Sequence, residues 1–137
     1  HTYDYIIEIR CTSPLKTAED VRACAELLWQ SGAESVIGIT PLQDHHPARA
    51  KRIINGMIRP FCVPEPASGR RQDLSPKAYI RNGTIYALRR EALMGPDAML
   101  FGHKHSLGYE MDRISSINID DEIDLLVAEA LLKQRES

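Results

Sequence analysis

The stretch Ser116-Ile117-Asn118-Ile119-Asp120-Asp121-Glu122-Ile123-Asp124 joins two predicted elements of the fold. Ile117 and Ile119 alternate with Asn118 and Asp120, which is typical of the end of a strand, and the acidic residues that follow are typical of a helix start. Because residues two apart on a strand point to the same face, Asn118 and Asp120 are expected to lie side by side. Two oxygen-bearing side chains at the carboxyl end of a strand suit a hard divalent cation such as Mg²⁺.

The same stretch also has a structural interpretation. Asp120 or Asp121 is then the N-cap of the helix, and the other acidic side chains stabilise its positive end. The two interpretations are compatible, because an N-cap residue can also bind a metal ion.

The length and composition indicate a single domain at most. The 137 residues, 43% of them hydrophobic and 26% charged, are enough to bury a reasonable core. A net charge of −2 argues against a nucleic-acid partner held by bulk positive charge. Cys11, Cys24 and Cys62 form no CxxC pair, so we expect reduced thiols in a cytoplasmic protein. No apolar run is long enough to span a membrane and no signal peptide is recognisable, while the start at His1 rather than Met suggests processing upstream.

The first forty residues are expected to form a strand, a helix and a second strand, over residues 3–10, 17–31 and 35–40. The first strand alternates, with Tyr5, Ile7 and Ile9 on one face, and is predicted to be largely buried. Thr17 and Asp20 have the spacing of a capping box at the helix start. The strand-helix-strand order favours a parallel pair of strands with a right-handed crossover.

The remainder of the chain contains further elements around a long polar segment. Asn55-Gly56 is a strong two-residue turn signal and predicts a hairpin over residues 52–59. Residues 60–76 are long for a connection, which indicates a functional, interface-forming or mobile segment. The other predicted elements are a strand over 78–88 with an interruption at Asn82-Gly83, a short helix over 89–94, strands over 106–111 and 113–118, and a final helix from about residue 121. The order of these elements predicts an α/β sheet protein with an inserted arm over about residues 45–78. No GxGxxG or Walker-type phosphate-binding loop occurs in the sequence.

Five motifs, in matching order, resemble those of the acylneuraminate cytidylyltransferases, the CMP-sialic acid synthetases. Residues 116–124 resemble that family's S-I-D-I-D-x-x-x-D, in which two acids hold Mg²⁺; here the second acid is Asp120, and Asn118 replaces the first. Residues 12–17 resemble T-S-P-L-R-T, with Arg10 and Cys11 where Gln and Pro are usual. The other three resemble H-H-P at 45–47 with Arg49 two residues later, R-Q-x-L at 71–74, and N-G-A-I-Y at 82–86, where Ile80-Arg81 replaces an Arg-Pro pair.

The resemblance implies a Rossmann-like nucleotidyltransferase fold of the nucleotide-diphospho-sugar transferase type, with a three-layer α/β sheet and a dimerisation arm. It extends over nearly all of residues 1–137 and corresponds to the C-terminal two thirds of the family, whose N-terminal nucleotide-binding part has no counterpart here. The implied activity is transfer of CMP from CTP to a nonulosonic acid such as N-acylneuraminate, with release of pyrophosphate. Mg²⁺ is the implied cofactor, and a second copy of the chain is the implied partner.

By resemblance, Asp120 and Asn118 form the metal site, and catalysis depends on Asp120 and Arg10. The residues expected to contact the substrates are Thr12, Ser13, Arg49, Arg71, Arg81, Asn82 and Tyr86. A guanidinium group suits the carboxylate of the sugar, and Mg²⁺ suits the charge that grows on the α-phosphate.

These candidates have structural interpretations as well. The arginines, Arg71 among them, would be solvated surface charges, whereas the functional alternative for Arg71 is that it reaches the site of a partner subunit in a dimer. The hydroxyl groups would serve turn chemistry before Pro14. Asn82-Gly83 would be a backbone kink, and Tyr86 would be a core aromatic residue.

A second hypothesis belongs to a different class of protein. The chain would be a catalytically incomplete module that binds a sugar acid, or dimerises, and needs a separate N-terminal nucleotide-binding part. This hypothesis predicts a strand edge left open for that part. The substitutions at Arg10, Asn118 and Ile80-Arg81 leave the particular sugar open, with legionaminic or pseudaminic acid as alternatives to a sialic acid.

Overall fold

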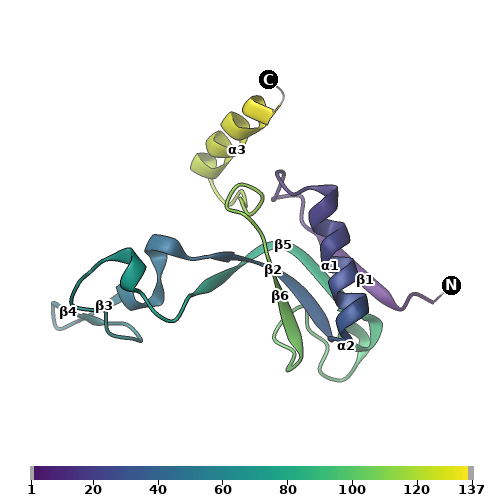
Figure 1. The fold of residues 1–137 in the computed structure, drawn as a ribbon, viewed down its shortest axis with the longest axis horizontal. Coiled ribbons are helices and arrows are strands. Elements are labelled where there is room, and N and C mark those ends of the chain that lie inside the picture. The colour runs from purple at the N-terminus through teal and green to yellow at the C-terminus, as the bar shows by residue number, and fades with distance from the viewer. Residues whose placement is uncertain (1, 136–137) are drawn as a thin grey trace. The chain divides into compact units, whose positions relative to one another are not determined.

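The computed structural model describes residues 2–135, which divide into two compact units. One unit consists of the residues up to Thr40 together with those from Arg81 onward, and the other of residues 41–80. The fold class is α/β, as predicted, and Figure 1 labels the elements. Those lying wholly or mostly in the first unit are β1 (Tyr5–Ile9), α1 (Ala18–Ser31), β2 (Ser35–Pro41), β5 (Tyr79–Arg89), α2 (Arg90–Met94), β6 (Ser106–Glu110) and α3 (Glu122–Arg135).

Helix α1 begins and ends where the sequence predicts. Thr17 is its N-cap: the Thr17 hydroxyl accepts a hydrogen bond from the Asp20 amide at 3.1 Å, and the Asp20 carboxylate accepts one from the Thr17 amide at 2.8 Å. This reciprocal pair satisfies two amides that have no partner inside the helix. At the other end Gly32 has a φ of 68°, a left-handed conformation that glycine adopts without steric cost.

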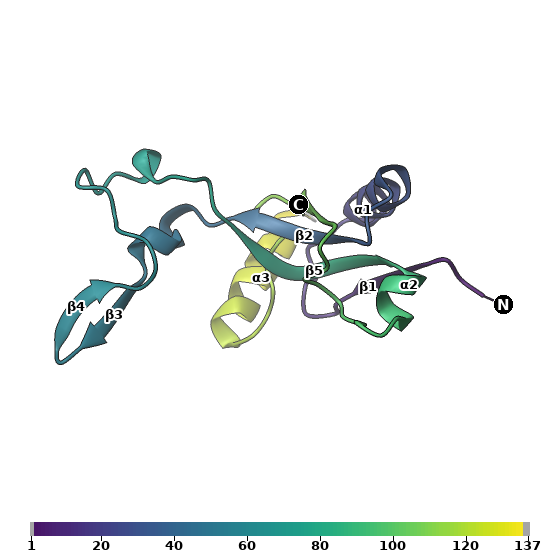
Figure 2. The ribbon, with the colours of Figure 1, turned by 90° about the horizontal axis from the view of Figure 1, so that it is seen from below.

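The four strands form a mixed sheet in the order β1-β5-β2-β6. β1 is antiparallel to β5, and β2 is parallel to β6. The Arg89 amide at the end of β5 donates a hydrogen bond to the Glu34 carbonyl just before β2, so β5 also runs opposite to β2, as the arrows in Figure 2 show. The first two strands, predicted as a parallel pair, therefore run in the same direction but are not hydrogen-bonded to each other, because β5 lies between them. Local order along the chain did not reveal this insertion, since β5 comes from a later part of the sequence.

Helix α1 packs on one face of this sheet. Cys24 and Leu28, four residues apart on the helix, face the sheet and are both fully buried. Burial, with a smaller contribution from the charge of Asp20, raises the pKa of the Cys24 thiol to about 12. The cluster at the centre of the core consists of Cys24, Leu28, Val36, Ile85, Ala87 and Met111.

Strand β1 is less buried than the sequence predicts. Tyr5, Ile7 and Ile9 are all exposed. Tyr5 and Ile7 line a shallow apolar pocket of about 230 Å³ together with Trp29 of α1, whose side chain is 71% exposed. The prediction of a largely buried strand is wrong because β1 is an edge strand, and the residues of α1 that face Tyr5 and Ile7 leave an open pocket over them.

Residues 112–116 form a turn instead of the predicted strand over 113–118. The Asp112 carboxylate accepts hydrogen bonds from the amide and the hydroxyl of Ser115 at 2.8 and 2.9 Å. The bond from the Ser115 amide is the largest cause that lowers the pKa of the Asp112 carboxyl. Strand β6 ends at Glu110, so Asn118 and Asp120 lie in a connecting segment and not at a strand end. The side chain of Asp112 satisfies the backbone of this segment in a turn, so the segment does not pair as a strand.

Helix α3 confirms the predicted final helix, but its apolar stripe is not buried. Ile123, Leu126 and Val127 are exposed, whereas Ala128 is buried. At its end Arg135 donates a hydrogen bond to the Leu15 carbonyl at 2.8 Å. Helical periodicity thus predicted the element correctly, but burial of its apolar face depends on tertiary contacts. Neither α3 nor any other helix in the described part of the chain has the length and apolarity to cross a membrane.

The second unit contains the predicted hairpin, made of β3 (Lys51–Ile54) and β4 (Met57–Pro60). The two residues between the strands, Asn55 and Gly56, have φ values of 52° and 76°, as a two-residue turn of this kind requires. Every residue of both strands is exposed. Three short 3₁₀ turns complete this unit: η1 (Gln43–His45), η2 (Pro47–Arg49) and η3 (Arg71–Asp73).

Candidate functional site

The loop that follows β1 meets the segment that precedes α3. Asn118 Oδ1 accepts a hydrogen bond from Thr12 Oγ1 at 2.7 Å and another from Ser13 Oγ at 3.3 Å. The Ile119 amide donates to the Thr12 carbonyl at 2.8 Å. The structure therefore brings together three site residues, Thr12, Ser13 and Asn118, that are widely separated in the sequence.

The side chain of Lys16 binds two backbone carbonyls of the same loop. Lys16 Nζ donates hydrogen bonds to the carbonyls of Arg10 and Ser13 at 2.6 and 2.8 Å. The Ser13 amide also donates to the Arg10 carbonyl at 3.3 Å. These bonds fix the backbone of Arg10 and Ser13, and they add a positive charge beside the loop.

Asn82 links β5 to the same region. Its Nδ2 donates to Ser116 Oγ at 3.0 Å, and its Oδ1 accepts from the Thr84 amide at 3.1 Å. Thr84 Oγ1 in turn donates to Ser13 Oγ at 3.4 Å. The predicted interruption of this strand is a local kink, since β5 is continuous although Gly83 has a φ of 71°. Asn82 is buried and uses its amide within the protein, so it holds the backbone of the site.

Two arginines lie against one tyrosine ring. The guanidinium carbon of Arg10 is 5.4 Å, and that of Arg81 5.8 Å, from the centroid of the Tyr86 ring. Arg81 Nη1 donates a hydrogen bond to Tyr86 Oη at 3.1 Å, and Arg10 Nε donates one to Glu8 Oε1 at 3.1 Å. Arg10 comes close because β1 is antiparallel to β5, with Glu8 opposite Tyr86. Tyr86 is only 1% exposed, so it acts as the buried support for two cationic side chains.

The two neighbouring acids before α3 have different surroundings. Asp121 Oδ1 accepts hydrogen bonds from the amides of Ile123 and Asp124 at 2.9 and 3.0 Å, so Asp121 is the helix cap. Asp124 Oδ2 accepts from the amides of Asp120 and Asp121 at 3.0 and 3.3 Å. The side chain of Asp120 is exposed and makes no hydrogen bond or ion pair with any residue in the range 2–135. The cap and the candidate ligand are thus two separate residues.

The side-chain oxygens of Asp120 and Asn118 are of the chemical type that Mg²⁺ takes as ligands. Mg²⁺ is usually held by one or two protein carboxylates, with water and phosphate oxygens in the other positions. Asp120 offers a charged oxygen with no competing partner. Asn118 Oδ1 already accepts two hydroxyl hydrogen bonds, so it would be the weaker, neutral ligand of such an ion. Within the described residues, no three His, Cys, Asp or Glu side chains are grouped so that they could hold a metal by themselves.

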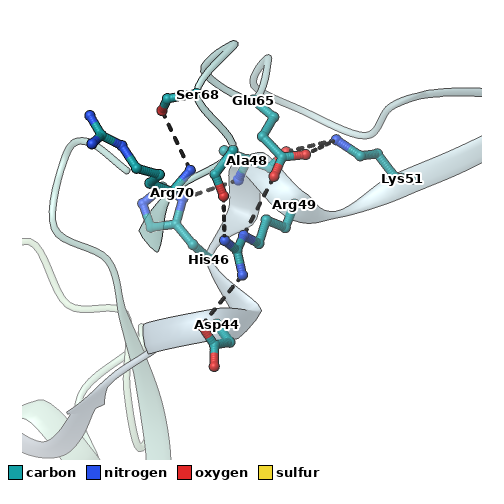
Figure 3. Close-up of polar contacts among 9 residues, drawn as sticks. Asp44, His46, Ala48, Arg49, Lys51, Glu65, Ser68 and Arg70 are labelled. Atoms are coloured by element: carbon teal, nitrogen blue, oxygen red, sulfur yellow. Dashed lines mark hydrogen bonds and ion pairs between the residues drawn. The ribbon is translucent and has the colours of Figure 1, made fainter. Parts of the chain in front are cut away.

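Arg49 belongs to the second unit and lies in an ion-pair network there. Its Nη1 is 3.4 Å from Asp44 Oδ1, and its Nη2 donates to the Gly69 carbonyl at 2.8 Å. Its buried Nε is 3.4 Å from Glu65 Oε1, an ion-pair distance, but in a direction that makes no hydrogen bond. Figure 3 shows Glu65 between Arg49 and Lys51, and the hydrogen bond from Lys51 is the largest cause that lowers the pKa of the Glu65 carboxyl. These contacts hold the backbone of the second unit together.

Arg71, also in the second unit, lines a pocket of about 310 Å³ with Gln43 and Leu74. His46 lies at the same pocket and is nearly buried. Its Nδ1 accepts a hydrogen bond from the Ala48 amide at 3.2 Å, so Nε2 carries the proton and donates to the Pro76 carbonyl at 2.8 Å. His46 is therefore a structural residue, while Arg71 is exposed at the rim.

Phe101, which contacts Arg81, was not identified from the sequence. The guanidinium carbon of Arg81 lies 3.7 Å from the centroid of the Phe101 ring. His103 fixes the same segment, because its Nε2 is 3.1 Å from the Ala92 carbonyl oxygen. An isolated aromatic residue in a segment without periodicity carries no sequence signal of such a contact. Only the fold brings Phe101 to β5.

The chain resembles a curated protein over nearly its whole length. No family model matches this chain. The chain is similar to the post-translational flagellin modification protein B of Campylobacter coli, with 26% identity over 136 residues. The match covers 97% of this chain and 54% of that protein. The chain therefore spans about half the length of this curated relative.

Proposed function

We propose that this chain holds the sugar-acid and Mg²⁺ sites of a nucleotidyltransferase that transfers CMP from CTP to a nonulosonic acid such as N-acylneuraminate and releases pyrophosphate. The observation that carries the proposal is the convergence on one region of three segments that are far apart in the sequence. These are the loop after β1, the first half of β5 and the segment before α3. Each contains one of the motifs that resemble the cytidylyltransferases.

The cationic part of the site suits the carboxylate of a sugar acid. Arg10 and Arg81 each use one N–H group in a hydrogen bond to the protein, at Glu8 and Tyr86. A guanidinium group has five N–H donors in a rigid plane, which match a carboxylate in a bidentate pair. The exposed hydroxyl of Thr12 lies beside this region and suits a polar group of a sugar, whereas Ser13 is fully buried and its hydroxyl bonds to Asn118 and Thr84 inside the protein.

The oxygens of Asp120 and Asn118 would hold Mg²⁺. When bound, this ion supplies charge neutralisation at the α-phosphate of CTP. The task of the chain itself is positioning. The bonds from Lys16 to the backbone of Arg10 and Ser13, and from Thr12 to Asn118, hold these groups in one frame, which favours in-line attack by the sugar hydroxyl.

The Campylobacter relative supports the same class of substrate. Its name refers to the modification of flagellin. A sugar acid linked to CMP is an activated donor that such a modification would consume. We therefore propose a nonulosonic acid as the acceptor in this reaction.

The test is a pyrophosphate-release assay with CTP, Mg²⁺ and a panel of nonulosonic acids. Asp120→Ala should abolish turnover and leave the free energy of unfolding unchanged, because the Asp120 side chain has no protein partner among residues 2–135. The matched control is Asp121→Ala, which removes the helix cap and should cost about 1 kcal/mol of stability while sparing the rate. Full activity of Asp120→Ala would exclude the metal site.

A second candidate function is a sugar-acid-binding module that needs a separate nucleotide-binding part. The open edge of β1 beside an exposed apolar pocket favours this candidate, as does the coverage of only 54% of the relative. Calorimetric titration separates the two. A chain that binds N-acetylneuraminate but shows neither CTP binding nor turnover is the incomplete module, whereas turnover by the chain alone excludes it.

We propose a second copy of the chain as partner, bound through the hairpin of β3 and β4. A two-stranded hairpin is marginally stable in water on its own. Ile53 and Ile58 are opposite each other in this hairpin, and both are exposed. Apolar groups gathered on such an element are typical of an interface.

We also propose a cytoplasmic location, because the three cysteines form no disulfide-type pattern and are free thiols.

A further inference from the structure

Phe101 lies between α2 and β6, and its ring stacks on the guanidinium group of Arg81. The guanidinium carbon of Arg81 is 3.7 Å from the centroid of the Phe101 ring. At this distance a guanidinium plane is in cation–π contact with the ring face. The contact holds the guanidinium group of Arg81 over the Phe101 ring.

A second ring fixes the same guanidinium group by a different bond. Arg81 Nη1 donates to Tyr86 Oη at 3.1 Å, and the centroids of Tyr86 and Phe101 are 6.2 Å apart with an angle of 36° between the rings. The contact with Phe101 holds the guanidinium group over the ring, and the bond to Tyr86 restricts its rotation there. An arginine side chain has many rotamers when free, so the two rings remove an entropic cost that ligand binding would otherwise carry.

The position of Phe101 is not explained by core packing alone. Its side chain is 43% exposed. The segment that carries it is tied down two residues later by His103, whose Nε2 lies 3.1 Å from the Ala92 carbonyl oxygen and whose Nδ1 lies 3.4 Å from Ser35 Oγ. The Phe101 ring is thus half-exposed and lies on a segment that hydrogen bonds hold in place. Its contact with the guanidinium group of Arg81 can therefore orient that group.

We infer that Phe101 is a positioning residue, which holds Arg81 so that its N–H edge is available to the carboxylate of an anionic ligand. The identity of this ligand as a sugar acid rests on the proposed function, whereas the stacking does not. The four further N–H groups of Arg81 have no hydrogen-bond partner among the described residues, so they can pair with a carboxylate. Phe101 thus acts through Arg81 and not on the ligand.

The first experiment needs no ligand. The Nε–Hε resonance of Arg81 is assigned by its absence in Arg81→Lys, and its shift reports the ring current of a stacked aromatic side chain. Phe101→Leu should move this resonance toward the value of a free arginine, while Phe101→Trp, which keeps a ring, should retain the ring-current shift. Met99→Leu in the same segment is the matched control. An unchanged resonance in Phe101→Leu would overturn the inference.

The second experiment measures binding of N-acetylneuraminate by calorimetry in a double-mutant cycle. Phe101→Leu should weaken binding by about tenfold, and Phe101→Trp should restore it. In an Arg81→Ala background, Phe101→Leu should have no further effect. An equal loss in that background would mean that Phe101 contacts the sugar directly, which contradicts a role through Arg81.

The two experiments distinguish this inference from the proposed function. If the wild-type chain binds no nonulosonic acid, the proposed function fails, and the resonance of Arg81 alone decides whether Phe101 positions it. If binding occurs but the cycle shows no coupling between Phe101 and Arg81, the proposed function stands and the inference fails.

Discussion

Thr12 Oγ1 and Asn118 Oδ1 are joined by a hydrogen bond of 2.7 Å, although 106 positions separate the two residues in the chain. The bond connects the loop after β1 with the segment before α3. The first of these carries Arg10, and the second carries Asp120. The sugar-binding and metal-binding parts of the proposed site therefore share one frame, and a change at either residue should affect both.

The first prediction concerns the neutral ligand at position 118. Asn118→Asp keeps an oxygen that accepts the hydroxyls of Thr12 and Ser13, and it adds a charge beside Asp120. The Mg²⁺ concentration at half-maximal pyrophosphate release should fall by about tenfold, because a charged oxygen binds this ion more tightly than an amide. An unchanged Mg²⁺ requirement would remove Asn118 from the metal site.

The second prediction concerns the hydrogen bond itself. Thr12→Val removes the donor to Asn118 while keeping the shape of the side chain. The free energy of unfolding should fall by about 1 kcal/mol, as for the loss of one ordinary hydrogen bond. The KM for the sugar acid should rise at the same time, since Asn118 loses its fixed position. Thr2→Val, at an exposed position in the N-terminal segment, is the control in chemical denaturation and in kinetics.

The third prediction concerns Arg10. Arg10→Ala should raise the KM for the sugar acid by about tenfold or more, because a bond to a charged group is lost. Arg10→Lys should restore little of it, since an ammonium group cannot form the planar bidentate pair. Arg22→Ala is a matched control, because Arg22 is an exposed residue of α1 whose side chain pairs with Glu19. Equal kinetics for Arg10→Ala and Arg22→Ala would place Arg10 outside the site.

The fourth prediction concerns the three thiols. Cys11 and Cys62 are exposed and should react with a thiol reagent near pH 8, whereas Cys24 is buried with its pKa raised to about 12 and should react only after unfolding. The raised pKa means that the Cys24 thiol stays protonated up to a higher pH in the folded state than in the unfolded state. The contribution of this thiol to the free energy of unfolding is therefore complete below pH 9 and is lost as the pH rises toward 12. Cys24→Ala should remove this alkaline step, which a pH series of unfolding curves would detect.

The fifth prediction concerns the hairpin of the second unit. Ile58 is 68% exposed in the isolated chain. If the hairpin forms the dimer interface, Ile58→Lys should convert the dimer to a monomer in sedimentation velocity runs, because a charge placed in an apolar interface is costly. Met94→Lys, at an exposed position on α2, should leave the mass unchanged. A dimer that survives Ile58→Lys would require another interface.

The elements best predicted from the sequence depend on neighbours along the chain. The capping box of Thr17 and Asp20 and the Asn55-Gly56 turn are both found as expected. Their energetics involve residues within four positions of each other, so a single sequence contains the whole signal. The predicted strand over 113–118 failed because Asp112, just before it, caps a turn with its own side chain.

Burial was harder to predict than secondary structure. Tyr5, Ile7 and Ile9 alternate as a strand should, and Ile123, Leu126 and Val127 repeat as a helix should, yet all six are exposed. Periodicity reports that a face is apolar, but it does not report whether anything covers it. The coverage depends on the strand order, which places β1 at an edge.

By itself the sequence determined the class of fold, the caps and turns, and the set of motifs that suggest a sugar-acid site, because short-range sterics and hydrogen bonding decide these features. Only the tertiary structure decided that β5 lies between β1 and β2, that Asp121 and not Asp120 caps α3, and that Phe101 stacks on Arg81. Strand order and the stacking join groups that are distant along the chain. The choice between adjacent aspartates depends on backbone geometry. None of these three is encoded in a local pattern.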